Sequence, residues 1–311
     1  MSDDAVCQIS VVVATVGRPL LLTQLLRSVV RCRPLPAEVI VSDGSRRPGT
    51  HRAVQRIRRC FAERGSRLLH VTCPRGLSRQ RSAGVRASRC PLVVFLDDDA
   101  APCAEFFAAL VEEAESDAAR QVGGFGFMIT RADCGDTVPG GGRYDRKGRP
   151  RALGASMSGQ VHFLAGCAAY RRQVFARFRP PEAFGGYAQG EDRLFSGLVG
   201  TRWRLRIVPG ALLVHFKAGE GRPAGFAKGF TTGRNHVALG LALVRAGADY
   251  PALPYAARLF ASACFRAGQS LLNMRLGQVA VHAGRACGVA PGLLLGLCSP
   301  GSALGLSGVL E

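Results

Sequence analysis

Apolar runs alternate with amphipathic segments along the first hundred positions of the chain. The runs at 6–15, 37–43, 67–72 and 91–97 are continuous and rich in branched residues, as buried strands are. The segments between them, at 20–30, 51–64 and 78–88, place apolar residues at helical spacing. The order predicts a βαβαβαβ arrangement.

This alternation predicts an α/β protein with a Rossmann-like, mostly parallel sheet and helices on both of its faces. The ligand site of such a sheet lies beyond the carboxyl ends of its strands. The polar residues at those ends are Thr15, Asp43 and the triplet Asp97, Asp98 and Asp99. Because adjacent carboxylates repel one another and are costly to bury without a partner, we expect a cation or water beside the triplet.

The pattern changes beyond the triplet. A Glu-rich helix is expected after position 101, and the Gly-rich segment GGGRYDRKGRP at 140–150 predicts a mobile loop that acts as a lid or linker. A second Gly-rich stretch leads into a helix that begins with Glu191 and Asp192. A strand-like run at 203–216 then ends near His215.

The region from about 250 to 311 carries four arginines and a single acid among many Leu, Ala, Val and Phe. The segment at 254–285 predicts one or two helices with few polar positions. Such helices either pack against the rest of the chain or a second copy, as a homodimer, or lie in a membrane interface. We favour the interface. The longest uncharged stretch, 286–310, contains Pro291, Pro300 and six glycines, which disfavour a regular spanning helix.

Composition narrows the possible partners and compartment. The 311 residues are 47% hydrophobic with a net charge of +19, and 17 of the 41 basic residues precede Cys90 against five acids. Nucleic acid, anionic lipid and phosphorylated small molecules all fit such a surface, which is also consistent with a solvated basic face. The eleven cysteines include no CxxC pair and the start of the chain shows no export signal, so we expect reduced thiols in the cytoplasm.

Two common nucleotide-binding motifs are missing from the sequence. A dinucleotide fold would carry GxGxxG after the first strand, where this chain has ATVGRP, and a P-loop requires GK followed by Ser or Thr, which occurs nowhere. An aspartyl phosphatase is also disfavoured, because its aspartates would follow the first strand rather than the fourth.

Several segments in order resemble the metal-dependent, inverting glycosyltransferases of family 2, which have the GT-A fold. They are VVVATVGRP, VIVSDGS, RGLSRQRSAGVRAS, FLDDDA, FLAGCAAYRR and GGYAQGEDRLF, within 9–235. The resemblance implies a nucleotide-diphosphate sugar as donor, a divalent cation (Mg²⁺ or Mn²⁺) at the aspartates, and an acceptor hydroxyl activated by a carboxylate. It also implies a catalytic domain at 1–235, with a nucleotide-binding half at 1–100, an acceptor-binding half at 101–235 and an apolar helical region at 236–311.

The aspartate triplet receives metal and donor roles from this resemblance. Asp97 and Asp99 point to the same side of an extended segment, and carboxylates are the ligands that Mg²⁺ and Mn²⁺ prefer. The resemblance makes Asp99 the direct metal ligand and assigns Asp97 to the ribose or to the metal through water. Asp98 faces elsewhere and assists donor binding. His215 is either a third metal ligand or a structural histidine.

The resemblance also assigns residues to the donor and to the chemistry. Asp43 corresponds to a position that binds the nucleobase, although Ser42 replaces an acid that the family often has there. Asp192 is the expected catalytic base, with Glu191 orienting the acceptor, whereas the alternative for both is a helix cap. The remaining residues assigned to the donor are Thr15, Arg18, Arg75, Arg79 and Arg81.

The alternative class of function is a non-catalytic, basic protein that binds nucleic acid or other anions. A phosphate backbone would meet three aspartates at the site that the sheet offers, so nucleic acid is not the expected partner. The sequence leaves open the sugar, the nucleotide and the acceptor, for which glycans and lipid-linked molecules both remain. A role in cell-surface glycan or polysaccharide biosynthesis is the context that we expect.

Overall fold

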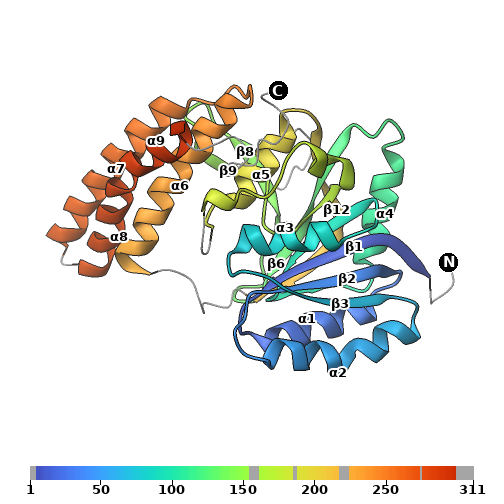
Figure 1. Cartoon of the computed structure of the whole chain (residues 1–311). Coiled ribbons are helices and arrows are strands. Elements are labelled where there is room, and N and C mark those ends of the chain that lie inside the picture. The colour runs from blue at the N-terminus through green and yellow to red at the C-terminus, as the bar shows by residue number, and fades with distance from the viewer. Residues whose placement is uncertain (1–4, 154–160, 185–187, 217–223, 274, 299–311) are drawn as a thin grey trace.

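A computed structural model describes residues 5–153, 161–184, 188–216, 224–273 and 275–298. Its first part confirms the predicted alternation of strands and helices (Figure 1). The elements are β1 (Val6–Thr15), α1 (Pro19–Arg31), β2 (Leu35–Asp43), α2 (Gly49–Glu63), β3 (Arg67–Thr72), α3 (Leu77–Ala87) and β4 (Leu92–Asp97).

The second part completes the main sheet and adds a small one. Its strands are β5 (Ala100–Pro102), β6 (Val122–Arg131), β7 (Thr137–Pro139), β8 (Gly141–Tyr144), β9 (Pro150–Ala152), β10 (Phe163–Leu164), β11 (Ala168–Arg171) and β12 (Arg204–His215). Its helices are α4 (Phe106–Ser116), the short 3₁₀ helices η1 (Arg172–Ala176) and η2 (Glu182–Phe184), and α5 (Glu191–Gly200).

The main sheet has the strand order β3-β2-β1-β4-β11-β6-β12-β5, with β7 paired to β6. Strands β3, β2, β1 and β4 are parallel, as the sequence predicts. Strand β11 runs antiparallel between β4 and β6, and β5 runs antiparallel to β12, so the sheet as a whole is mixed. The parallel half therefore directs the ends of β1, β2 and β4 toward one edge.

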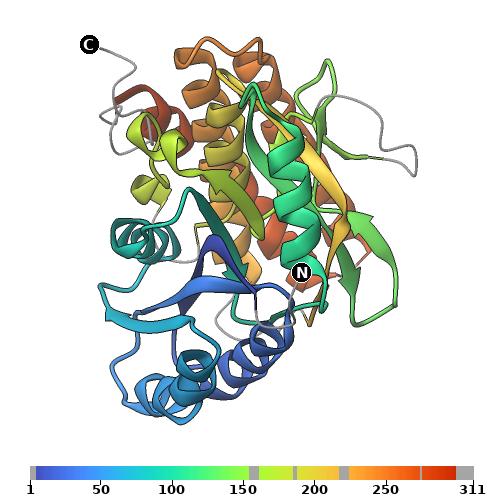
Figure 2. The same cartoon turned by 90° about the vertical axis from the view of Figure 1, so that its right-hand side faces the viewer.

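Helices cover both faces of the sheet (Figures 1 and 2). Ile9, Val11 and Val13 of β1 belong to a core shared with α1, α2 and α4, whereas Val12 belongs to a core on the opposite face with α5 and α6. Helix α3 lies on this second face, against β1 and β2. Burial on both faces explains why the strands read as continuous apolar runs.

The Gly-rich segment at 140–150 is not the mobile loop that the sequence predicts. It forms β8 and the start of β9, and β8 pairs with both β9 and β10 in a small antiparallel sheet. A Cβ at Gly142 would lie 2.1 Å from the carbonyl oxygen of Arg151, so the glycine allows a close approach between strands. Gly141 and Gly142 are buried, which is inconsistent with a lid.

The carboxyl-terminal region is helical, as predicted, and consists of α6 (Gly225–Arg245), α7 (Ala252–Leu272), α8 (Leu276–Cys287) and α9 (Val289–Cys298). The other three helices pack on α6, whose buried face also belongs to the second core. The domain boundary predicted after Asn235 lies within α6.

One stretch of the described residues, Leu276–Cys298 across α8 and α9, is long and apolar enough to cross a membrane by length and composition, with a mean hydropathy of 1.3. Part of the uncharged stretch at 286–310 lies outside the described residues.

Candidate active site

The aspartate triplet lies at the junction of β4 and β5. Asp97 ends β4, and Asp98 and Asp99 form the turn into β5. Strand β5 pairs with β12 so that Ala100 lies opposite His215, and the Phe216 amide donates to the carbonyl oxygen of Asp99. This pairing brings a histidine more than one hundred positions away to the triplet.

Asp97, Asp99 and His215 form a cluster that could hold a metal ion. The Nε2 atom of His215 lies 3.5 Å from Oδ2 of Asp97 and 3.4 Å from Oδ1 of Asp99. One ligand atom from each of the three residues lies within 4.8 Å of the others. Two carboxylates and an imidazole fit a divalent cation, because carboxylate oxygens suit Mg²⁺ and Mn²⁺ and imidazole nitrogen is a common metal ligand.

Asp98 points away from this cluster. Its Oδ2 accepts a hydrogen bond from the Thr15 hydroxyl at 2.7 Å, and its Oδ1 lies 3.0 Å from Nη1 of Arg18. Burial raises the pKa of Asp98, although the Thr15 hydroxyl and the charge of Arg18 oppose the rise. Asp98 therefore ties the end of β1 to the end of β4.

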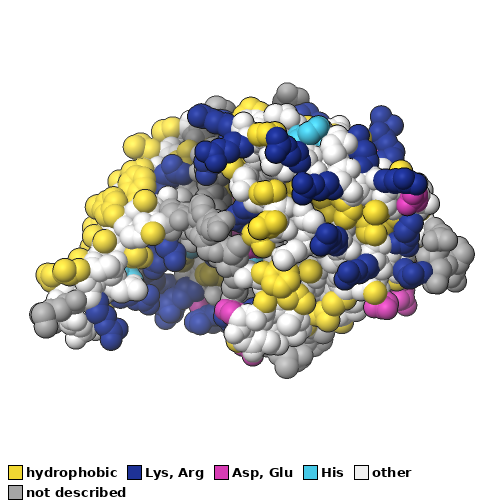
Figure 3. Space-filling model, turned by 90° about the horizontal axis from the view of Figure 1, so that it is seen from below, with side chains coloured by type: hydrophobic (Ala, Val, Ile, Leu, Met, Phe, Trp, Pro, Cys, Tyr) yellow, Lys and Arg dark blue, Asp and Glu magenta, His cyan; other side chains and the backbone are white. Residues whose placement is uncertain are grey.

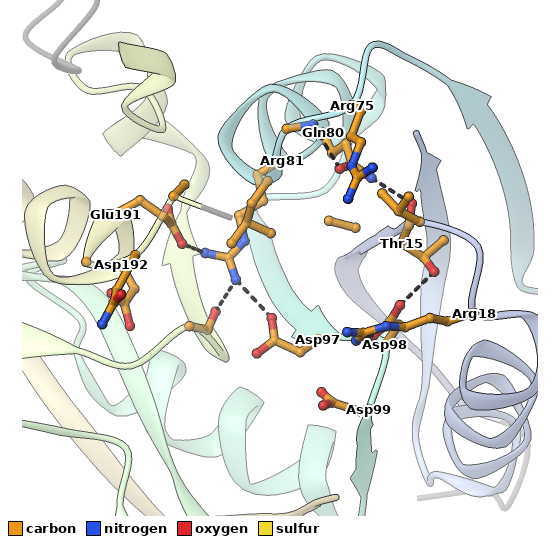
Figure 4. Close-up of a pocket in the computed structure, with 18 of the residues that line it drawn as sticks. Thr15, Arg18, Arg75, Gln80, Arg81, Asp97, Asp98, Asp99, Glu191 and Asp192 are labelled. Carbon is orange, nitrogen blue, oxygen red and sulfur yellow. Dashed lines mark hydrogen bonds and ion pairs between the residues drawn. The ribbon is translucent and has the colours of Figure 1, made fainter. Parts of the chain in front are cut away.

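The buried guanidinium of Arg81 lies between Asp97 and Glu191 (Figure 4). It forms an ion pair with Glu191 and donates to Oδ1 of Asp97 at 3.1 Å and to the carbonyl of Gly166 at 3.0 Å. Burial would raise the pKa of Asp97, but hydrogen bonding to His215 and the charge of Arg81 lower it to about 2. Burial raises the pKa of Glu191 to about 7, and Arg81 opposes that rise.

These residues surround a cavity of about 430 Å³. Residues at the ends of β1 and β4 line one side of the cavity, and residues at the start of α5 line another (Figure 4). Of the residues predicted from the sequence, the cavity brings together Thr15, Arg18, Arg75, Arg81, Asp97, Asp98, Asp99, Glu191 and Asp192. This volume is within the range of small-molecule sites.

Asp43 and Arg79 are not among the described residues that line this cavity. Asp43 ends β2, where its carboxylate lies 2.9 Å from Nε2 of His70 and accepts a hydrogen bond from the Ser45 amide. Arg79 lies on another side of α3, and its Nε is 3.8 Å from a carboxylate oxygen of Glu182. Their assignment to the donor remains a prediction.

Gln80 and Arg193 line the cavity, although the sequence analysis names neither as a site residue. Gln80 donates to the carbonyls of Thr15 and Ser42 at 2.8 and 2.9 Å, which fixes the ends of β1 and β2 against α3. Arg193 follows the Glu191–Asp192 pair directly and adds a cation to the cavity wall. Gln80 lies within RGLSRQRSAGVRAS and Arg193 within GGYAQGEDRLF, two of the segments that resemble family 2. Their position inside these segments is the sequence signal that could have identified them as site residues.

The start of α5 presents Asp192 to the cavity. Gly190, with a φ of +87°, precedes the helix, and Oδ1 of Asp192 accepts a hydrogen bond from the Arg193 amide. Within the part of the chain that the structure describes, no cation forms an ion pair with Asp192, in contrast to the buried pair of Glu191 and Arg81. Of the two neighbouring acids at the start of α5, Asp192 is therefore the one whose charge is available to a ligand.

Helix α6 holds the loop before α5 in place. The side-chain amide of Asn235 donates to the Gln189 carbonyl at 2.9 Å, and the Thr232 hydroxyl donates to the Gln189 side chain at 2.9 Å. Asn235 is fully buried. Helix α6, within which the predicted domain boundary lies, therefore helps to hold the predicted catalytic pair in position.

The comparison with known families agrees with this geometry. The model described as glycosyl transferase family 2 matches residues 10–179, more than half of the chain. The chain belongs to glycosyl transferase family 2. No curated protein sequence matches this family 2 chain.

Solved structures that are similar to this family 2 chain show its fold. The mannosyltransferase PcManGT from Pyrobaculum calidifontis, solved with GDP-Man and Mn²⁺, is 17% identical with a TM-score of 0.52, over 92% of this chain and 85% of that one. TarS from S. aureus is 17% identical with a TM-score of 0.53, over 85% of this chain and 44% of TarS, so the match spans less than half of TarS. GalNAc-T7, solved with UDP, GalNAc and Mn²⁺, has 17% identity and a TM-score of 0.56 over 74% of this chain and 47% of its own. The fold is the predicted GT-A fold.

Proposed function

We propose that this family 2 protein transfers a sugar from a nucleoside diphosphate donor to an acceptor hydroxyl with inversion at the sugar. The observation that carries the proposal is a single cavity lined by Asp97 and Asp99 on one side and Asp192 on another. Family membership supports it, as do the nucleotides and Mn²⁺ named for PcManGT and GalNAc-T7.

Asp97, Asp99 and His215 are the residues that would hold a divalent cation, Mg²⁺ or Mn²⁺. When bound, such an ion supplies positive charge that stabilises a departing diphosphate. Arg18 and Arg75 line the same cavity from the β1 and α3 side, and guanidinium groups suit diphosphate oxygens.

Asp192 is the proposed general base. The acceptor oxygen forms a bond to the anomeric carbon while the bond from that carbon to the diphosphate oxygen breaks, and the acceptor proton moves to the Asp192 carboxylate. Such a single displacement inverts the anomeric configuration. Glu191 holds Arg81 in place through a buried ion pair, and because it also lines the cavity it is the residue that would orient the acceptor.

The proposal extends to the setting of the reaction. A glycan or lipid-linked acceptor, used in cell-surface glycan or polysaccharide biosynthesis in the cytoplasm, fits a family 2 transferase. The nucleotide, the sugar and the acceptor are to be identified by assay.

The test is hydrolysis or transfer with a panel of UDP- and GDP-sugars, with Mn²⁺, with Mg²⁺ and with a chelator. We expect turnover that the chelator removes, and loss of turnover in Asp99→Ala because the cluster loses a buried carboxylate. Asp249→Ala, at an exposed aspartate outside the cavity, is the matched control and should retain activity.

A wild-type rate in Asp99→Ala would contradict the assignment of the cluster. The alternative, a non-catalytic anion-binding protein, predicts a different result with the same preparation, namely tight, salt-sensitive binding of polynucleotide and no turnover with any donor.

A further inference from the structure

Helix α7 presents an apolar surface outward. Among the exposed positions of this helix, a stripe with helical spacing carries no polar side chain, and it consists of Leu253, Ala257, Phe260, Ala261, Cys264, Phe265, Gly268 and Leu271. Phe260 is 50% exposed, Phe265 67% and Leu271 59%. The inward positions Tyr255, Ala256 and Ala263 are buried. A helix on the surface of a soluble protein normally carries polar residues on its outer face, so this arrangement requires an explanation.

The two helices that follow α7 also expose apolar side chains. Leu276, at the start of α8, is 70% exposed, and Leu294 and Leu297 of α9 are 64% and 61% exposed. Figure 3 shows hydrophobic side chains gathered along the left-hand edge of the molecule, over the C-terminal helices. We name the exposed apolar residues of α7, together with these three leucines, the outer helical surface.

The charged residues within α7 and at the start of α8 are all arginines. Arg258 and Arg266 belong to α7, and Arg275 precedes α8. All three side chains are exposed. Residues 250–298 contain no Asp or Glu, in a chain whose net charge is +19. Apolar side chains flanked by cations are typical of helices that bind an anionic lipid surface.

We propose that the outer helical surface docks the protein on an anionic membrane, as a peripheral protein with α7 lying in the plane of the interface. Phe260, Phe265 and Leu271 insert among the acyl chains, and Arg258 and Arg266 contact lipid headgroups. A second copy fits this surface less well, because a two-fold contact would bring the arginines of one copy against those of the other without an acid from 250–298 to pair with them. The inference is independent of the proposed function.

The test is flotation of the purified full chain with vesicles of phosphatidylcholine alone or mixed with phosphatidylglycerol. We expect flotation with the anionic vesicles and little with the neutral ones. Phe260→Ser and Phe265→Ser should each reduce partitioning about tenfold, because membrane burial of a Phe side chain contributes at least that factor. Arg258→Gln should reduce it about fivefold, and only on anionic vesicles.

Val138→Ser is the matched control, because Val138 is an exposed apolar residue of β7, far from the C-terminal helices in the sequence. It should float like the wild type, and circular dichroism should show all variants folded.

Flotation that is absent, or unaffected by both Phe variants, overturns the proposal. A dimer in light scattering that Phe260→Ser disperses, without flotation, identifies a contact between copies instead. Resistance to an alkaline carbonate wash indicates that Leu276–Cys298 spans the bilayer and overturns interfacial docking.

Discussion

Three adjacent aspartates are stable at the end of β4 because each has a different set of neighbours. Asp97 has Arg81 and His215, Asp98 has Thr15 and Arg18, and Asp99 has His215. The alternation of an extended segment directs the first and third toward the candidate metal cluster and the second toward β1. The repulsion expected from the sequence is therefore balanced by cationic and hydrogen-bonding groups supplied from the end of β1, the residue before α1, α3 and β12.

The two acids at the start of α5 have different environments although they are neighbours in sequence. Glu191 is buried against Arg81, whereas Asp192 lines the cavity without a cationic partner among the described residues. Removal of one member of a buried ion pair leaves the other uncompensated, at a cost of about 3–5 kcal/mol. A substitution at Glu191 thus changes stability and activity together, and Asp192 is the position where chemistry can be tested separately.

Asp192→Asn should retain donor binding and lose most of kcat. The amide preserves the shape and the hydrogen bond from the Arg193 amide but cannot take a proton, so a loss of about 10²- to 10⁴-fold in kcat is expected. Calorimetric titration with donor and steady-state kinetics measure the two quantities separately. A comparable loss of donor affinity would show that Asp192 binds the donor rather than acting as the base.

At the scale of elements, long-range contacts determine the parts of the site that the sequence did not reveal. Thr232 and Asn235 of α6 are 43 and 46 positions from Gln189 in sequence, yet both donate hydrogen bonds to Gln189. The loop that precedes the catalytic pair is therefore shaped by a helix beyond β12.

Asn235→Ala should lower kcat about tenfold or more, since it removes the donor to the Gln189 carbonyl and lets the start of α5 shift. The free energy of unfolding should fall by about 1–3 kcal/mol, because a buried carbonyl loses its partner. Chemical denaturation and kinetics on the folded fraction check the two effects. Asn273→Ala, an exposed asparagine after α7, is the matched control. If kcat per folded molecule is unchanged, Asn235 has only a structural role.

The first seven elements were predictable because local patterns determine them. Each strand is a continuous apolar run, and its terminal polar residue had to lie at one edge of a parallel sheet. The predicted loop at 140–150 was wrong because glycine signals both turns and close strand contacts, and the sequence alone does not distinguish them. Asp43 lies beside His70, and Arg79 lies beside Glu182. These neighbours depend on how the strands and α3 are oriented in the fold, and the local sequence does not specify that orientation.

At the scale of the whole molecule, the cavity joins two parts of the chain. Thr15 and Arg75 come from the first hundred residues, and Gly190 and Asp192 come from the start of α5, which α6 supports. A ligand that contacts both sides stabilises the folded state by mass action, by about 2.7 kcal/mol at one hundred times its Kd. The shift in Tm that such a ligand causes therefore tests whether the two sides of the cavity form one binding site.

We expect the donor nucleotide and Mn²⁺ together to raise Tm by several degrees, and each alone to raise it less. In a chain of this size about 1 kcal/mol corresponds to roughly 2–4 °C. Scanning calorimetry with UDP or GDP, with and without Mn²⁺, measures the shift, and the nucleotide giving the larger shift identifies the base. Asp99→Ala should lose the increment that Mn²⁺ adds while keeping the unliganded Tm near that of the wild type, because Asp99 is the buried carboxylate of the cluster. An equal nucleotide shift with and without Mn²⁺ would mean that the nucleotide binds without a cation, and Asp97, Asp99 and His215 would then need another role.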